Sequence, residues 1–94
     1  MREMEQNIVH SGNEFFLDIG GERSLLSYEL FGDNTVVFTH TFVPENLRGQ
    51  GIASRLIRRG VEWAHDKGYN IVAECWAVER FLERHPEYRQ PVHR

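Results

Sequence analysis

The chain has 94 residues, of which 40% are hydrophobic, 12% aromatic and 27% charged, and its formal net charge is −3. This length and apolar content favour one globular domain over residues 1–94, and the acidic balance argues against a broad basic surface for nucleic acid. Charges interrupt every apolar stretch before the roughly 18 residues that a membrane span needs, so we expect a protein that does not enter a membrane. The single cysteine cannot form an internal disulfide, and we therefore expect a cytoplasmic protein.

The first half of the sequence is typical of antiparallel strands. Residues 1–12 show no helical period and are expected to form a loose end or a short edge strand. Segments 14–19 and 24–31 are rich in Phe, Leu, Ile and Tyr and are separated by a glycine turn, which predicts a hairpin. Residues 35–43 carry many β-branched and aromatic side chains and predict the strongest strand, which Pro44 should end.

The second half predicts a strand, a helix and another strand. Apolar residues recur at intervals of three and four from 51 to 67, so this segment is an amphipathic helix that Gly68 stops. Residues 69–75 are expected to form a short buried strand, parallel to the strand before the helix. Residues 77–84 then predict a short C-terminal helix that Pro86 terminates. The pattern is therefore an α+β or α/β fold, with a mostly antiparallel twisted sheet and one parallel crossover.

The turn Arg48-Gly49-Gln50-Gly51 joins the strongest strand to the strongest helix. No Ser, Thr or Asp precedes Ile52 to cap the helix, so its first N–H groups and its dipole are available to an anion such as pyrophosphate. Glycines permit close approach of the backbone, and Arg48 can add a charge-assisted contact. The alternative is a simple tight turn with a solvated arginine. The turn is neither a Walker loop nor a dinucleotide fingerprint.

This turn resembles motif A of the Gcn5-related N-acetyltransferases, Gln/Arg-x-x-Gly-x-Gly/Ala, which Arg48, Gly51 and Ala53 match. Nearly the whole chain is similar to the small stand-alone branch of that family. The further residues that carry this resemblance are His40-Thr41-x-Val43-Pro44, Cys75-Trp76 and Arg84-His85-Pro86-Glu87-Tyr88.

The resemblance implies a compact Gcn5-related acetyltransferase fold, with acetyl-coenzyme A as co-substrate and an amine of a small molecule or peptide as acceptor. It also implies that the edge of the strand before the turn binds the pantetheine arm. Early strands without an intervening helix leave the acceptor site open or incomplete, so a coenzyme A-binding or sensing module without transfer is the alternative. The residues expected at the coenzyme are Thr41, Phe42, Val43, Arg48, Gly49, Gln50, Gly51, Ile52, Ala53 and Ser54.

Two residues are the candidate catalytic groups. By the resemblance, Cys75 lies near the thioester, where it either accepts acetyl covalently or acts as an acid, and the alternative is an inert buried thiol. His40 is the candidate base, because its ordinary pKa of about 6.5 permits proton exchange near neutrality, and the alternative is a structural histidine. A cysteine hydrolase that uses both residues ranks last, because it leaves the phosphate turn unexplained. We expect no metal, and a monomer or weak homodimer.

Other basic and aromatic residues have simpler explanations. Arg55, Arg58 and Arg59 are expected to form a solvated helix face, although one of them could reach the ribose phosphate. Four aromatic residues offer possible stacking surfaces, but most of them are expected in the core. They are Phe38, Trp63, Trp76 and Phe81.

Overall fold

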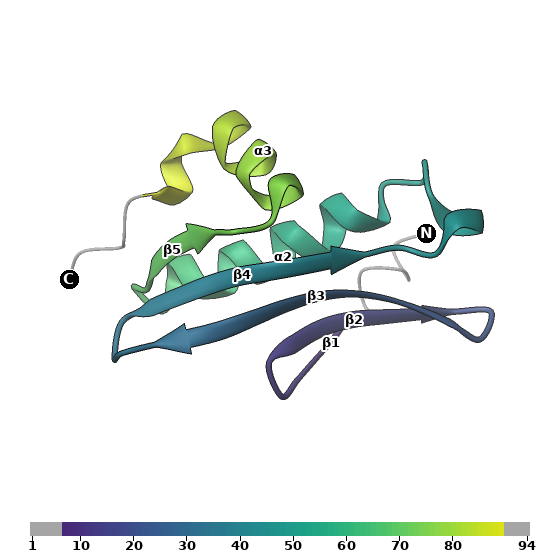
Figure 1. The fold of residues 1–94 in the computed structure, drawn as a ribbon, viewed down its shortest axis with the longest axis horizontal. Coiled ribbons are helices and arrows are strands. Elements are labelled where there is room, and N and C mark those ends of the chain that lie inside the picture. Colours follow the sequence, from purple (N-terminus) through teal and green to yellow (C-terminus); the bar gives the residue numbers. More distant parts are fainter. Residues whose placement is uncertain (1–6, 90–94) are drawn as a thin grey trace.

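A computed structural model describes residues 7–89 as one five-stranded sheet with helices packed against it (Figure 1). The strands follow the order β1-β2-β3-β4-β5; neighbours are antiparallel from β1 to β4, and β5 is parallel to β4. This confirms the α+β class and the parallel crossover. The elements are β1 (Val9–Ser11), β2 (Glu14–Ile19), β3 (Glu22–Phe31), β4 (Thr35–Phe42), the 3-10 turn η1 (Glu45–Leu47), α2 (Ile52–Asp66), β5 (Asn70–Ala73), α3 (Trp76–Arg84) and the 3-10 turn η2 (Pro86–Arg89).

The core lies between α2 and one face of the sheet. Alternate residues of the strands point to α2, because successive side chains of a strand face opposite sides. Gly60 lies at the centre of this interface, where an added Cβ would be 2.7 Å from Leu26 and 3.1 Å from Phe38. The fully buried large side chains are Phe15, Leu17, Leu26, Val36, Phe38, Ile52, Leu56, Val61, Val78 and Leu82.

The strand β5 leaves the sheet before β4 ends. Parallel pairing runs only from Thr35↔Asn70 to Phe38↔Ala73. The next two N–H groups, of Glu74 and Cys75, both donate to the carbonyl of Phe38, at 2.9 and 3.2 Å. The chain then turns into α3, which Figure 1 shows beyond β5 on the side away from β1 and β2. The prediction that the strand continues to residue 75 was therefore wrong, and Cys75 is instead the N-cap of α3.

Several element boundaries and the exposure of one aromatic side chain differ from expectation. Strand β3 begins at Glu22, and the 3-10 turns η1 and η2 occupy segments predicted only as loop and helix end. The expected edge strand exists as β1, whereas residues 1–6 lie outside the described residues. Phe38 and Phe81 are buried as expected, but Trp76 is 71% exposed. Among residues 7–89, no helix has the length and apolar character to cross a membrane.

Candidate functional site

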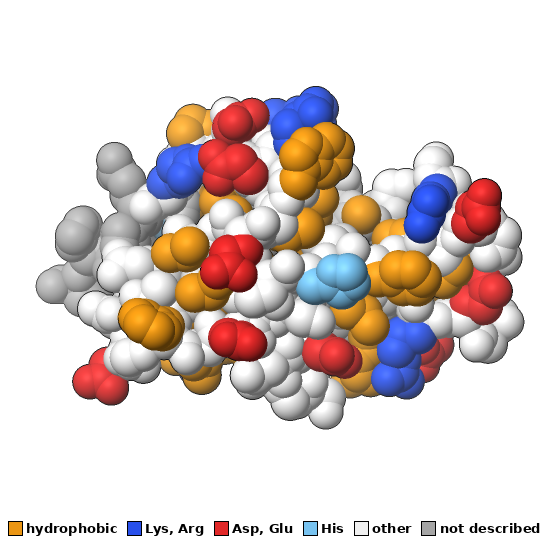
Figure 2. Space-filling view, in the orientation of Figure 1, with side chains coloured by type: hydrophobic (Ala, Val, Ile, Leu, Met, Phe, Trp, Pro, Cys, Tyr) orange, Lys and Arg blue, Asp and Glu red, His pale blue; other side chains and the backbone are white. Residues whose placement is uncertain are grey.

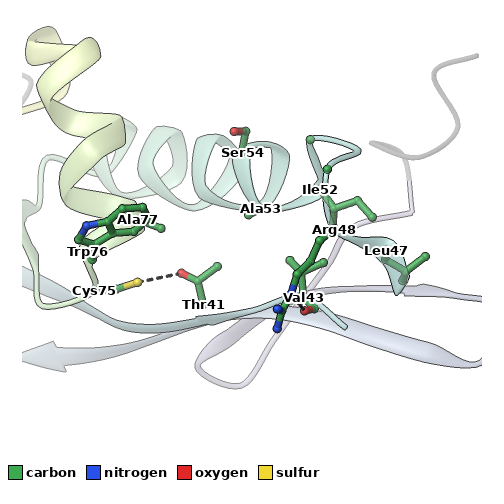
Figure 3. Close-up of a pocket in the computed structure, with 12 residues that line it drawn as sticks. Thr41, Val43, Leu47, Arg48, Ile52, Ala53, Ser54, Cys75, Trp76 and Ala77 are labelled. Carbon is green, nitrogen blue, oxygen red and sulfur yellow. Dashed lines mark hydrogen bonds between the residues drawn. The ribbon is translucent and has the colours of Figure 1, made fainter. Parts of the chain in front are cut away.

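A cavity of about 370 Å³ lies between the C-terminal part of β4, the start of α2 and the start of α3 (Figure 3). It exists because β5 diverges from β4 after Ala73, while α2 still crosses over β4. The cavity runs from the sulfur of Cys75 to the glycine turn. Its lining residues are Thr41, Val43, Leu47, Arg48, Gly49, Gly51, Ile52, Ala53, Ser54, Cys75, Trp76 and Ala77.

One end of the cavity is the glycine turn. Gly51 is the N-cap of α2 with φ 79°, and no side chain caps the helix. Gly49 also has a positive φ, of 84°, a conformation that glycine adopts without steric cost. The first turn of α2 contains no acidic residue, so the partial positive charge of its N–H groups is not neutralised there. This end suits an anion.

Two arginines hold the turn in shape. Nε of Arg48 donates to the carbonyl oxygen of Val43 at 2.9 Å, which ties the turn back to the end of β4. Nη1 of Arg55 donates to the carbonyl oxygen of Gln50 at 3.3 Å. Both bonds occupy backbone carbonyls, and no side chain caps the N–H groups at the start of α2.

The other end of the cavity is the Cys75 thiol. Its sulfur lies 3.2 Å from Oγ1 of Thr41, as the dashed line in Figure 3 marks. Partial burial raises the pKa of the thiol, but the hydroxyl of Thr41 and the backbone N–H groups of Val78 and Ala77 lower it by more, so the net pKa lies below that of an ordinary cysteine. These donors stabilise the thiolate, which is the nucleophilic form of cysteine.

The charges around the cavity also favour an anionic ligand. The protein has 14 acidic residues, yet no acidic side chain is among those that line this cavity in residues 7–89, whereas Arg48 is. An anion would therefore meet backbone dipoles and one guanidinium without direct repulsion from a carboxylate.

Most of the residues predicted at the coenzyme lie together in the cavity wall. The exceptions are the side chains of Phe42 and Gln50, which do not line it. Alternation along β4 explains Phe42, because Thr41 and Val43 face the cavity and Phe42 points to the opposite face, where it is 43% exposed. Beyond Phe38, the edge of β4 that pairs with β5 has no further strand partner in the described chain.

The two predicted catalytic residues do not meet. His40 pairs with Ser27 of β3 and is exposed. Because it precedes Thr41 in the strand, its side chain lies on the face of β4 opposite to Cys75. The sequence also missed three lining residues, Leu47, Trp76 and Ala77. No spacing pattern could indicate them, because they reach the cavity only through the turn η1 and the departure of β5. Within residues 7–89, no three His, Cys, Asp or Glu side chains group as metal ligands would.

Comparison with known families accounts for this arrangement. Residues 14–92 match the profile of the GCN5-related N-acetyl-transferase family. The chain belongs to this family. The match includes β4, the glycine turn, α2 and Cys75, so the whole candidate site lies within the part that defines family membership.

Curated relatives of the same size class are similar over most of the chain. Protein NATD1 of Xenopus tropicalis is 31% identical over 65 residues, which are 69% of this chain and 60% of that protein. Protein NATD1 of Danio rerio is 29% identical over 83 residues, covering 84% of this chain and 76% of that protein. The chain thus spans 60% of the length of the frog relative.

A solved structure shows the same fold. The solution structure of a GCN5-like protein from Staphylococcus aureus superimposes with a TM-score of 0.73 at 24% identity. The superposition covers 99% of this chain and 94% of the other. The five-stranded sheet and its parallel crossover are therefore the small single-domain form of the acetyltransferase fold.

Proposed function

We propose that this protein transfers acetyl from acetyl-coenzyme A to a primary amine of a small molecule or peptide. The observation that carries the proposal is that one cavity joins an uncapped, glycine-flanked helix start to a thiol of lowered pKa. The first feature suits the diphosphate of the coenzyme, and the second suits the thioester at its far end.

The proposed chemistry has two steps. The thiolate of Cys75 attacks the thioester carbonyl, so a bond forms between its sulfur and the acetyl carbon, and the coenzyme leaves as a thiolate. A neutral amine then attacks acetyl-Cys75; the new C–N bond replaces the C–S bond, and the Cys75 thiolate is released. The amine gives up one proton, and the coenzyme thiolate takes one up.

His40, the other candidate catalytic residue, is exposed on the face of β4 opposite to Cys75. A general base must lie within hydrogen-bond reach of the proton that it removes, and an amine that attacks acetyl-Cys75 lies on the other face of the sheet. We therefore assign His40 no part in either step.

The test follows the thiol and the acetyl group separately. We expect acetyl-coenzyme A without amine to add one acetyl group to the protein, detected by intact mass, and Cys75→Ala to remove this adduct without weakening coenzyme binding. With an amine panel, Cys75→Ala should slow thiol release at least about 100-fold, whereas His40→Gln should leave both the adduct and its discharge unchanged. Full turnover in Cys75→Ala would refute the acetyl-cysteine step.

A coenzyme A-binding module without transfer is the second candidate. It is favoured by one feature of the described chain: tight turns alone connect β1 to β4, so no helix walls an acceptor pocket there. Binding of coenzyme A with no discharge to any amine would select this alternative.

A further inference from the structure

The hydroxyl of Thr41 differs from that of its neighbour Thr39 in what it contacts. Oγ1 of Thr39 donates its proton to the carbonyl oxygen of Ser27, at 3.3 Å. Oγ1 of Thr41 lies 3.2 Å from the sulfur of Cys75, and either atom can be the donor. Within residues 7–89, no backbone carbonyl accepts the proton of Thr41. This hydroxyl can therefore accept a proton from the thiol and give its own proton to a ligand in the cavity.

The cavity offers few other groups that can move a proton. Among the described residues, its wall contains no His, Asp, Glu, Lys or Tyr side chain, and the guanidinium of Arg48 stays protonated. On the face seen in Figure 2, acidic side chains lie at the surface, over the strands and over α3. The second hydroxyl of the wall belongs to Ser54, which points away from Thr41 and Cys75 (Figure 3). Thr41 is thus the hydroxyl within reach of the sulfur.

We propose that Thr41 is a catalytic residue that relays a proton between the thiol of Cys75 and the sulfur of the coenzyme. This inference rests on the proposed function, because it takes the thioester to lie against Cys75. In the first step, the sulfur of Cys75 attacks the acetyl carbon while its proton passes to Oγ1 of Thr41, and the proton of Oγ1 passes to the departing sulfur. The bond from the acetyl carbon to Cys75 forms, the bond to the coenzyme breaks, and the coenzyme leaves as a thiol.

The second step uses the same relay in the opposite direction. As the amine attacks acetyl-Cys75, a proton of the amine passes to Oγ1 of Thr41, and the proton of Oγ1 passes to the sulfur of Cys75 while the C–S bond breaks. Thr41 ends each step with one proton, as it began it, so neither step consumes another acid or base. The relay accounts for proton transfer in a cavity whose described wall has no histidine and no carboxylate.

The leaving group of the acetyl donor separates a relay from an effect on the thiol alone. The alkyl thiolate of coenzyme A is a strong base and leaves slowly unless it receives a proton, whereas a thiophenolate is a much weaker base and leaves without one. A residue that only promotes ionisation of Cys75 therefore affects both donors equally. A residue that protonates the leaving group affects the coenzyme thioester far more.

The test measures the rate at which one acetyl group is added to the full chain without amine, by intact mass, from saturating acetyl-coenzyme A and from S-phenyl thioacetate. The proteins are the wild type, Thr41→Val, Thr41→Ser and the control Thr39→Val, which removes a hydroxyl that has no contact with the sulfur. Cys75→Ala serves as the blank for acetylation elsewhere. Valine keeps the branched shape of threonine, and circular dichroism checks that each protein is folded.

We expect Thr41→Val to slow acetylation by acetyl-coenzyme A at least about 100-fold but acetylation by S-phenyl thioacetate only several-fold. Thr41→Ser keeps the hydroxyl and should restore most of the rate, and Thr39→Val should match the wild type. A change of the same size with both donors, or none, would overturn the relay and leave the proposed function intact. Absence of the adduct when the wild type meets acetyl-coenzyme A would overturn the acetyl-cysteine step and the relay together.

Discussion

The interface between α2 and the sheet is closed at one end and open at the other. At the closed end, β5 pairs with β4, and Gly60 lies against Leu26, Phe38 and Phe15 with no space for a methyl group. At the open end, β5 has left the sheet, and Gly51 and Ala53 of the same helix line a cavity. One helix thus stabilises the fold with its middle turns and leaves its first turn available for a ligand.

Filling the closed end should have the largest effect. We expect Gly60→Leu to lower the free energy of unfolding by about 3 kcal/mol, because overpacking outweighs the gain in helix propensity. Gly60→Ala should lower it by about 1 kcal/mol, since the added Cβ would meet Leu26 at 2.7 Å. Urea denaturation measures both.

The matched change at the open end is Ser54→Leu, on the exposed side of the same helix. It should alter the free energy of unfolding by less than about 0.5 kcal/mol. Equal losses for Ser54→Leu and Gly60→Leu would show that the two ends do not differ in packing.

The sheet also contains a partly buried histidine, His10 of β1, whose protonation should weaken the fold. His10 stacks on Phe15 at 4.0 Å, and its Nε2 lies 2.7 Å from the hydroxyl of Tyr28. Burial, followed by the positive charges of Arg59 and Lys67, lowers the pKa of His10. The unfolded chain therefore takes up the proton at a higher pH than the folded protein does. Stability that is present above pH about 6.5 should fall as the pH drops below that value.

The slope of this decrease cannot exceed about 1.4 kcal/mol per pH unit, the limit for one proton. Urea denaturation of the wild type and of His10→Gln, from pH 7.5 to 5, measures it. We expect the variant to be less stable at pH 7.5 but to lose less stability on acidification. Parallel curves for the two proteins would contradict a neutral, partly buried His10.

At the open end, the smallest expected change concerns the reactivity of Cys75. Thr41→Val removes the hydroxyl that lies 3.2 Å from the sulfur, so the pKa of the thiol should rise. Alkylation by iodoacetamide near neutral pH should then be several-fold slower, with its midpoint moved to higher pH. Because Cys75 is the single cysteine, the reaction reports this thiol alone.

The control for this change is Thr39→Val, on the same strand. Oγ1 of Thr39 donates to the carbonyl of Ser27 at 3.3 Å and has no contact with the sulfur. Its alkylation profile should match that of the wild type. A shift of the same size in Thr39→Val would assign the effect to the strand as a whole.

The sequence predicted the elements of this fold well where a local pattern defines them. The three- and four-residue apolar period predicted α2 within one residue of each end, and the turn at Gly20-Gly21 predicted the hairpin of β2 and β3. The sequence also predicted the turn that lines the cavity, because glycines and a missing cap are local features. The end of β5 was predicted wrongly, because the residues between Ala73 and Trp76 have the polarity of an ordinary strand end.

The order of strands and helices, the anion-suited turn and the identity of the single thiol follow from the sequence alone, because each depends on residues that are neighbours in the chain. The packing of the fold, in contrast, brings Thr41 to Cys75 and places His40 on the other face of the sheet. These relations depend on where β5 leaves β4 and on the angle at which α3 then packs. Both are set by contacts between segments that lie far apart in sequence.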